Sequence, residues 1–462
     1  MQKCRKTNEK IWQPIGHHVQ RLLFLIRNDV YINEQEPVRK RRSMPEQKEI
    51  YVTKIKVNKV RHLQNLEISL SSNEKKHLIL TGKNGSGKTS LLDAISVFLN
   101  SVTTSDQPMD VIKTEKLAES NLRHALNSGA EEHDIRNQKN TLAYFKELIK
   151  KSTGGLMLEM NTSLYDIKPL FSDGKFVVSY YKADRIFSAQ IPEYVEKVNL
   201  KKGYRISENP RHDFLKYLLD LKMTQALAAS NNKPEKAERI KEWFDKFQQL
   251  LRDIFENDTV GLIFDEDTFR FSIEMDGREP FDFNTLSSGY AAVLDIVVDL
   301  IIRMESQGNR VFDFTVPGIV LIDEIETHLH LELQKKILGM LTTIFPNVQF
   351  IVSTHSPFIL NSLENAVIYD LEKHLLVENG LANIPYDGIV EGYFESDCMS
   401  DSLKEKFEQY KYLATKKSLT DDDLEQISRL EMYLDEIPDY LALEITTEYQ
   451  RLKAQLRNRE DI

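Results

Sequence analysis

The chain has 462 residues, of which 41% are hydrophobic and 29% charged, and its formal net charge is −10. This length suits one large α/β domain with a smaller module, and the composition is that of an ordinary globular protein. No apolar run approaches the roughly 18 residues that would span a bilayer. The two cysteines, Cys4 and Cys398, have no metal or redox spacing. We therefore expect a cytoplasmic protein that does not enter the membrane, and we exclude a disulfide scaffold.

The first 43 residues are basic, with ten Lys and Arg residues against four acidic ones, which leaves −16 on the rest of the chain. The run Arg39–Arg42 could bind phosphate, so direct DNA contact is one interpretation. A solvated arm is the commoner role of such a run. Met44-Pro45 also begins a normal-looking domain, so residues 1–43 could lie outside the functional protein. We predict residues 1–48 to be a basic N-terminal extension that need not be ordered.

The predicted elements begin with two alternating runs at residues 50–57 and 66–70, which read as antiparallel edge strands. The apolar run His77–Leu80 predicts a short buried strand, and the glycine-rich turn Gly82–Gly87 follows it directly. A helix is expected next, because five apolar residues recur there on one helical face. These residues are Leu91, Leu92, Ile95, Phe98 and Leu99.

The rest of the chain alternates between helical and strand-like stretches. Helical insertions are expected near 105–155 and 205–257, and a polar break at Ser230–Pro234 predicts a helical hairpin in the second. Strands are expected at 177–181, 260–264, 268–273, 318–322 and 349–353. Beyond residue 370 the chain is acidic, with helices near 401–414, 421–435 and 439–457. Thr420 and Asp423 have the spacing of a helix cap, which favours a cap over a metal site in this acidic run.

A phosphate-loop pattern, G-x4-G-K-[ST], lies between the first buried strand and its helix. Its glycines allow backbone N–H groups to close around phosphates where a Cβ would clash or force an unfavourable φ. We expect Lys88 to reach the β- and γ-phosphates and the Thr89 hydroxyl to bind Mg²⁺. A chance match occurs in only about 2% of chains of this length, so we predict ATP and Mg²⁺ as ligands. The expected ATP-binding residues are Gly82, Lys83, Asn84, Gly85, Ser86, Gly87, Lys88, Thr89 and Ser90.

A second apolar run, Val320–Ile322, ends in two carboxylates, Asp323 and Glu324. Alone, this run could equally be a buried strand that ends in an acidic loop. In a chain with a phosphate loop, such a pair holds Mg²⁺ through its first member and polarises the attacking water through its second. We therefore predict Asp323 and Thr89 as metal ligands and Glu324 as a catalytic residue.

The run Leu286–Tyr290, Leu-Ser-Ser-Gly-Tyr, resembles the leucine-serine-glycine-glycine-glutamine signature of ATP-binding-cassette (ABC) ATPases. A Ser/Gly-rich helix start would explain the run alone, but the order of phosphate loop, signature, Asp-Glu strand and histidine loop supports the resemblance. It implies that Ser287, Ser288 and Gly289 contact the γ-phosphate held by a second copy, since helix N-termini bind anions. It also implies that His355, 32 residues past Asp323, is a catalytic γ-phosphate sensor.

Within this superfamily the chain resembles the RecF/SMC/OLD branch over most of residues 50–370. Arg61 lies where those proteins carry an arginine-containing turn, and Glu324–His330 resembles their Glu-x-Glu-x-His-Leu-His run. The resemblance implies an α/β fold, an ABC-type P-loop ATPase head with a mixed sheet and an antiparallel edge subdomain. It also implies that Arg61 contacts the nucleotide.

Tyr180–Arg185 and the acidic tail are more similar to the stand-alone ATPases of bacterial anti-phage systems, especially the Septu type. A Toprim nuclease module is not expected, because no strand-ending Asp-x-Asp follows His355. If DNA is cut, another chain should cut it. The chain departs from the family at Tyr290, where the signature usually has Gln or Glu, and its glutamine loop has only Gln190 as a candidate.

These observations predict three parts: the extension at 1–48, an ATPase domain at 49–370, and an acidic helical module at 371–462 that docks a partner. The predicted function is that of an ATPase whose ATP-sandwiched homodimer, or higher oligomer, controls an effector in bacterial defence. The expected effector is a nuclease encoded nearby. The alternative is a RecF/SMC-like repair ATPase that binds DNA and needs no effector. A small-molecule kinase would leave the signature, Glu324 and His355 unexplained, and a transporter subunit does not fit the inserted helices.

Overall fold

The computed structural model describes residues 49–185, 187–305, 312, 314–385, 388–390, 401–435 and 443–458. The chain divides into two units, Met1–Gln47 and Lys48–Ile462, and all described residues belong to the second. The predicted basic extension at 1–48 lies outside the described residues. Within those residues, no helix is both long and apolar enough to cross a membrane.

A six-stranded mixed sheet forms the centre of the fold, in the order β12-β11-β3-β10-β9-β5. The five strands from β11 to β5 are parallel, and β12 is antiparallel to β11. Strands that are covered on both faces are apolar throughout, which is why four of these six strands, β3, β5, β9 and β10, were predicted from the sequence, whereas β11 and β12 were missed. The strands are β3 His77–Thr81, β5 Val177–Tyr181, β9 Gly318–Ile322, β10 Val348–Ser353, β11 Ala366–Asp370 and β12 Leu375–Val377.

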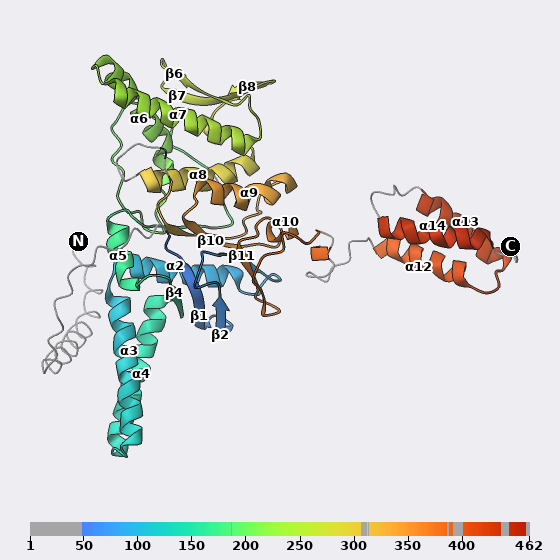
Figure 1. The fold of residues 1–462 in the computed structure, drawn as a ribbon, viewed down its shortest axis with the longest axis horizontal. Coiled ribbons are helices and arrows are strands. Elements are labelled where there is room, and N and C mark those ends of the chain that lie inside the picture. Colours follow the sequence, from blue (N-terminus) through green and yellow to red (C-terminus); the bar gives the residue numbers. More distant parts are fainter. Residues whose placement is uncertain are drawn as a thin grey trace, which may run out of the picture. The chain divides into compact units, whose positions relative to one another are not determined.

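Helices cover both faces of this sheet, as Figure 1 shows. Because side chains alternate along a strand, Leu78 and Leu80 pack on the side of α2, whereas Ile79 packs with α8 and α9. The five apolar residues predicted for one face of α2 are all buried. The helices around the sheet are α2 Lys88–Thr104, α5 Leu164–Ser172, α8 Ser288–Glu305, α9 Leu331–Ile344 and α10 Pro357–Leu360.

An antiparallel edge sheet, β2-β1-β4, was predicted in part. Its strands are β1 Val52–Val60, β2 Leu63–Ser69 and β4 Leu156–Met160, and sequence reasoning missed β4. The turn between β1 and β2 contains Arg61 at φ +50°. A buried amide, Gln349 of β10, joins this sheet to the central one by bonding both the N–H and the carbonyl of Val52.

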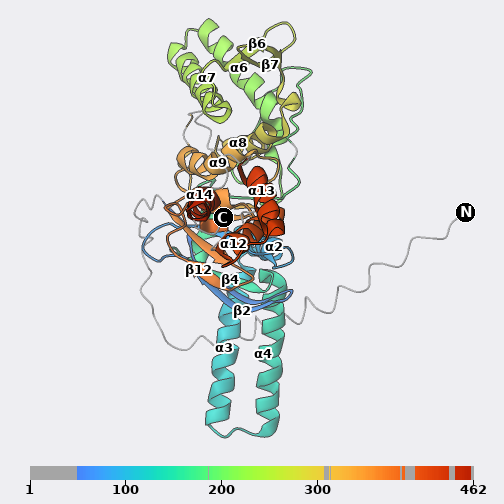
Figure 2. The same cartoon turned by 90° about the vertical axis from the view of Figure 1, so that its right-hand side faces the viewer.

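The two predicted helical insertions are helical hairpins, visible in Figures 1 and 2. In the first, α3 and α4 pack along each other through Ala118, Leu142 and Phe145. In the second, α6 and α7 enclose an aromatic core in which Trp243 stacks on Phe247. The hairpins and the short helix before the second are α3 Gln107–Asn127, α4 Glu132–Thr153, η1 Pro210–Asp213, α6 Phe214–Ser230 and α7 Pro234–Phe255.

A small antiparallel sheet, β6-β7-β8, packs on α7 and leads into the signature. Phe271 of β7 stacks on Phe244 of α7 with ring centroids 6.1 Å apart. The sheet therefore belongs to the same lobe as the α6–α7 hairpin. Its elements, with the short helix that follows, are β6 Gly261–Asp265, β7 Arg270–Met275, β8 Arg278–Phe281 and η2 Phe283–Thr285.

Three C-terminal helices pack on one another around Tyr410, Ile427 and Tyr449. The predicted cap is confirmed: the Thr420 N–H donates to Asp423 at 2.9 Å, and the Asp423 N–H donates to the Thr420 hydroxyl at 3.3 Å. The predicted boundary at residue 370 lies too early, because β12 pairs with β11 and so extends the central sheet. The helices are α12 Asp401–Thr415, α13 Asp421–Asp435 and α14 Leu443–Arg457.

Candidate nucleotide-binding site

The predicted motifs meet because their strands are neighbours. β3, β10 and β9 are adjacent and parallel, so the loops that follow them leave the same edge of the sheet. These loops carry the phosphate loop, His355 and the Asp323-Glu324 pair. The carboxylates of Asp323 and Glu324 are close enough to act electrostatically on both Lys88 and His355. Open parallel sheets bind their ligands at this carboxyl edge.

The phosphate loop has the backbone that its glycines were expected to permit. Gly82, Gly85 and Gly87 have φ of +125°, +84° and +104°, a region that residues with a Cβ rarely adopt. At Gly82 a Cβ would lie 3.0 Å from the Ser86 Oγ and 3.2 Å from an Asp370 carboxylate oxygen. At Gly87 it would meet the His62 ring. The loop therefore has room only for backbone at Gly82 and Gly87, whereas a Cβ at Gly85 would meet open space.

The polar groups of this loop fit a triphosphate. Lys88 is buried, and its ammonium donates to the carbonyls of Gly82 and Lys83 at 2.8 and 3.2 Å. Burial lowers the pKa of Lys88, and the negative charges of nearby carboxylates partly offset this decrease. The buried Ser86 Oγ has no hydrogen-bond partner among the described residues. Helix α2 starts at Lys88 without a side-chain cap, so its first N–H groups face an anion site.

The predicted metal ligands have the oxygen donors and surroundings that suit Mg²⁺. Thr89 is exposed at the start of α2, and Asp323 is 4% exposed at the end of β9. Ser353, at the end of β10, donates its hydroxyl to an Asp323 carboxylate oxygen and accepts the Glu324 N–H at 2.8 Å. Sequence reasoning missed Ser353. This hydroxyl fixes one carboxylate oxygen of Asp323 and leaves the other for a cation.

Glu324 stands in an unusual turn. Its φ is +45°, in a region that costs a non-glycine residue roughly 1–2 kcal/mol. The neighbouring Glu326 accepts the His355 N–H at 2.6 Å, so the two loops are tied together. Burial lowers the His355 pKa, and the Lys88 charge lowers it further. This shift favours the neutral imidazole, which can offer a hydrogen bond without adding charge, although the charges of Glu326, Glu324 and Asp323 oppose it.

The signature residues lie at the start of α8. Ser287 and Ser288 are exposed, whereas Gly289 is buried and a Cβ there would lie 3.1 Å from the His328 carbonyl. Tyr290, which replaces the usual Gln or Glu, packs against Phe255 of α7 with ring centroids 4.4 Å apart. The loop thus turns its backbone toward its own chain and leaves two hydroxyls accessible to another molecule.

Comparisons with known proteins agree with this geometry. A family model described as "AAA domain, putative AbiEii toxin, Type IV TA system" matches residues 78–361. That range contains the phosphate loop, the signature, the Asp323-Glu324 pair and His355. The chain belongs to this AAA-domain family.

The relatives of this AAA-domain chain include a Septu protein and a probable ATPase of a retron. Septu protein PtuA of Bacillus mycoides (strain KBAB4) is 25% identical over 406 residues, which cover 83% of this chain and 50% of PtuA. "Retron Vc95 probable ATPase" of Vibrio cholerae serotype O1 biovar El Tor is 25% identical over 369 residues, 65% of this chain and 70% of that protein. The chain thus spans about half the length of PtuA. The expected resemblance to a Septu-type ABC ATPase is confirmed.

Among solved structures, an SMC head bound to the C-winged helix domain of ScpA aligns with a TM-score of 0.35 and 14% identity. The alignment covers 69% of this chain and 94% of that one. A nucleotide-free ATP-binding cassette from an ABC transporter aligns with a TM-score of 0.30 and 13% identity over 72% of this chain and 94% of that one.

The two remaining predicted positions of this AAA-domain chain are the arginine-containing turn and the glutamine loop. Arg61 lies in the exposed β1–β2 turn, and it is the next residue, His62, whose ring contacts the Ser86 carbonyl at 3.0 Å. The turn therefore does meet the phosphate loop, through a residue that was not predicted. Gln190, the glutamine-loop candidate, is exposed, and its N–H bonds to the His212 carbonyl.

Further residues at this edge were missed because no motif marks them. The Asp370 side chain, at the end of β11, accepts the N–H groups of Glu372 and Lys373, and it also borders Gly82. Glu372 forms a 2.9 Å ion pair with Lys83. The strand β11 could have been found as an apolar run, but its role next to the phosphate loop depends on strand order.

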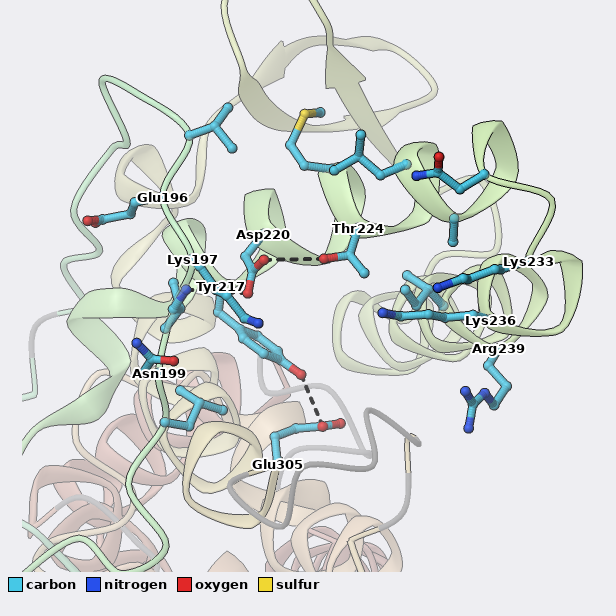
Figure 3. A pocket seen from close by; sticks show the side chains of 18 residues that line it. Glu196, Lys197, Asn199, Tyr217, Asp220, Thr224, Lys233, Lys236, Arg239 and Glu305 are labelled. Atoms are coloured by element: carbon cyan, nitrogen blue, oxygen red, sulfur yellow. Dashed lines mark hydrogen bonds between the residues drawn. The ribbon is translucent and has the colours of Figure 1, made fainter.

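A separate cavity of about 770 Å³ lies in the α6–α7 lobe of this AAA-domain chain, away from the phosphate loop. Figure 3 shows Lys233, Lys236 and Arg239 on one side of it and Glu196 on the other. Asp220 accepts from Thr224, and Tyr217 donates to Glu305, across its interior. It contains none of the predicted site residues.

Proposed function

We propose that this chain is a Mg²⁺-dependent ATPase whose nucleotide-driven dimerisation controls an effector protein in a bacterial defence system. The observation that carries the ATPase part is the convergence of Lys88, the Asp323-Glu324 pair and His355 at the ends of three neighbouring parallel strands, β3, β9 and β10. The names of the Septu and retron relatives support the defence part. Since the chain spans only about half of PtuA, partner and pathway belong to the proposal.

Substrate binding rests on the phosphate loop. Its N–H groups and the Lys88 ammonium surround the β- and γ-phosphates, in place of the carbonyl contacts that Lys88 makes in this structure. Thr89 and Asp323 hold the metal, because both present oxygen and Ser353 already orients the Asp323 carboxylate. Mg²⁺, when bound, neutralises charge on the phosphate oxygens.

Hydrolysis requires a base and a sensor. The half-buried Glu324 carboxylate is placed to take the proton of the attacking water. The His355 imidazole donates to the γ-phosphate, and the bond from the His355 backbone N–H to the Glu326 carboxylate holds the loop that carries it. These two side chains come from adjacent strand ends, so their separation is fixed by the pairing of β9 and β10.

The second half of the site comes from another copy of the chain. Ser287 and Ser288 are exposed at the N-terminus of an 18-residue helix, α8. Hydroxyls and N–H groups at such a position bind anions well. A second copy would present them to the γ-phosphate, which makes dimerisation depend on ATP and reversal depend on hydrolysis.

The C-terminal helices are the proposed docking surface for the effector. Tyr412 of α12 and Met432 of α13 are 68% and 72% exposed, and large apolar side chains at this exposure mark interaction surfaces when they gather. Co-expression with the expected effector, a nuclease if one is encoded near this gene, tests the assignment. Met432→Glu should lose the nuclease during purification, whereas Leu126→Glu, at an exposed site on α3, should retain it. Equal retention by both variants would remove this surface from the proposal.

The ATPase part is tested by phosphate release. Glu324→Gln keeps the size of the side chain but cannot take the proton, so its turnover should fall by about 10²–10⁴ with ATP affinity retained. Glu364→Gln, a change at an exposed glutamate, is the matched control and should keep the wild-type rate. Wild-type turnover by Glu324→Gln would show that the base is misassigned.

A further inference from the structure

Arg185 is a buried cation next to the proposed site, and the mechanism above does not use it. Its side chain is 4% exposed. It follows β5, which pairs in parallel with β9 so that Tyr181 lies opposite Ile322. The segment that leaves β5 therefore runs beside Asp323–Ile325, which we term the catalytic turn.

The guanidinium of Arg185 binds the backbone of every residue in the catalytic turn. One terminal nitrogen donates to the Asp323 carbonyl at 2.8 Å, and the other donates to the carbonyls of Glu324 and Ile325 at 2.8 and 3.2 Å. The first nitrogen also contacts the Lys182 carbonyl at 3.3 Å. Three successive carbonyls thus converge on a single cation.

This convergence explains how the turn keeps its conformation. Glu324 has φ +45°, which is unfavourable for a residue with a Cβ, and three carbonyl dipoles that point to one place repel one another. A planar guanidinium with donors in a fixed fork can satisfy several acceptors at once. An ammonium is a point charge on a flexible chain and cannot reproduce that arrangement.

The N–H side of the turn is held separately by β10. The Ser353 hydroxyl accepts the Glu324 N–H at 2.8 Å, and the Ser353 carbonyl accepts the Ile325 N–H at 3.1 Å. Thr327 contacts the Glu324 carboxylate itself at 3.4 Å. Arg185 from β5 and Ser353 from β10 therefore clamp the turn from its two neighbouring strands.

Charge balance keeps Arg185 ionised in this buried position. Burial lowers its pKa, and the carboxylates of Asp295, Glu326 and Asp323 oppose that effect. Asp295 belongs to α8, the helix that begins with the signature. The cation thus stands between the signature helix and the catalytic turn.

We propose that Arg185 is a positioning residue of the ATPase: by holding the three carbonyls of the catalytic turn, it orients the Glu324 carboxylate toward the attacking water. The inference rests on the proposed function, since it needs Glu324 to be the base. Arg185 touches neither nucleotide nor water in this account. Its effect on the rate passes entirely through Glu324.

The first test separates turnover from binding. Arg185→Lys keeps the positive charge but loses the fork, so kcat should fall at least about 10-fold while KM and the ATP dissociation constant change less than about threefold. Arg303→Lys is the matched control, because Arg303 is also buried and also donates to backbone carbonyls, those of Val178 and Tyr204. It should lower the melting temperature and leave kcat within about twofold. Equal kcat losses in the two variants would reduce Arg185 to a general structural role and overturn the proposal.

The second test is a double-mutant cycle with Glu324→Gln, read as single-turnover phosphate release. If Arg185 acts through Glu324, Arg185→Lys should slow the wild type but add no further loss once the carboxylate is gone. A loss of the same factor in both backgrounds means that Arg185 acts independently, which contradicts the proposal. Arg185→Lys is introduced into both backgrounds, so a general loss of stability would slow the wild type and Glu324→Gln by the same factor. Such a result would count as independent action.

Failure of the proposed function would look different. If Glu324→Gln alone turns over at the wild-type rate, the base is misassigned. The double-mutant cycle then cannot test Arg185, because removing the Glu324 carboxylate has no effect on the rate. If Glu324→Gln is slow but the cycle is additive, the ATPase assignment stands and only the role of Arg185 is wrong.

Discussion

The carboxyl edge of the central sheet and the interior beneath α8 hold their polar groups in different ways. At the edge, Lys88 begins α2, and Asp323 and Glu324 follow β9, so these groups lie at strand ends, where open parallel sheets bind their ligands. Beneath α8, Asp299 and Arg303 are 0% and 3% exposed and bind each other at 2.6 Å. The first region is the proposed ligand site, and the second is a buried network of hydrogen bonds within the protein.

The buried network explains how α8 is attached to the sheet. The Asp299 carboxylate accepts the hydroxyls of Tyr181 and Ser179 on β5 at 2.7 and 3.2 Å. Arg303 donates to the Val178 carbonyl of the same strand. The signature helix is therefore fixed to β5, whose continuation carries Arg185. The comparison teaches that the proposed chemistry lies at the edge, whereas the buried network attaches α8 to the sheet.

The largest expected effect comes from the edge. Lys88→Ala removes the only loop ammonium aimed at the β- and γ-phosphates, and charge-assisted hydrogen bonds are worth about 1.5–3 kcal/mol each. ATP affinity measured by titration calorimetry should fall by about 10² or more, and turnover should disappear. Lys59→Ala, at an exposed lysine on β1, should bind ATP as the wild type does. Turnover at the wild-type rate in Lys88→Ala would refute the ABC-type assignment.

The next effect tests the buried network. Arg303→Met leaves the Asp299 charge buried without its partner, and breaking a buried pair costs about 3–5 kcal/mol. Denaturant unfolding should show this loss of stability. The exposed pair of Arg123 and Glu119 is the contrast, since Arg123→Met should change stability by no more than about 1 kcal/mol. Similar losses in the two variants would mean that burial does not distinguish these ion pairs.

The carboxyl edge of the sheet could be predicted from the sequence, whereas the buried network beneath α8 could not. The apolar runs of β3, β9 and β10 and the order of the motifs predicted the strand ends that carry Lys88, Glu324 and His355, because those patterns are local. The network was invisible, since Asp299 and Arg303 sit within a stretch that reads only as an apolar helix.

Contacts that depend on strand order were equally hidden. Ser353 and Asp370 reach the site because β10 and β11 flank β3, and nothing near them in the sequence states that neighbourhood. His62 rather than Arg61 meets the phosphate loop, since the tight β1–β2 turn directs the second residue to Ser86. Tyr290 shows that a motif departure can be a packing choice, here against Phe255.

The smallest effect belongs to the exposed cap of α13. Hydrogen bonds from Lys416 and Thr420 lower the Asp423 pKa to about 2 from its usual 3.8. A carboxyl with a depressed pKa stabilises the folded state above its unfolded pKa, and this contribution is lost as pH falls from about 3.8 to about 2. Protection factors at the first turn of α13, which are corrected for the intrinsic pH dependence of amide exchange, should therefore fall over that range. Asp423→Asn should already have lower protection factors at pH 7 and show no further fall over that range, and unchanged protection in this variant would contradict a stabilising cap.

The central claim is that ATP joins two copies of the chain, and the solution mass of Glu324→Gln measured by light scattering tests it most directly. Because this variant should bind ATP but hydrolyse it slowly, ATP should shift it from its nucleotide-free mass to a dimer or higher assembly. Adding Ser287→Arg puts a bulky cation at the exposed signature and should prevent the shift with ATP still bound. A Glu324→Gln mass that does not respond to ATP, or a Ser287→Arg double variant that still assembles, would contradict the sandwich.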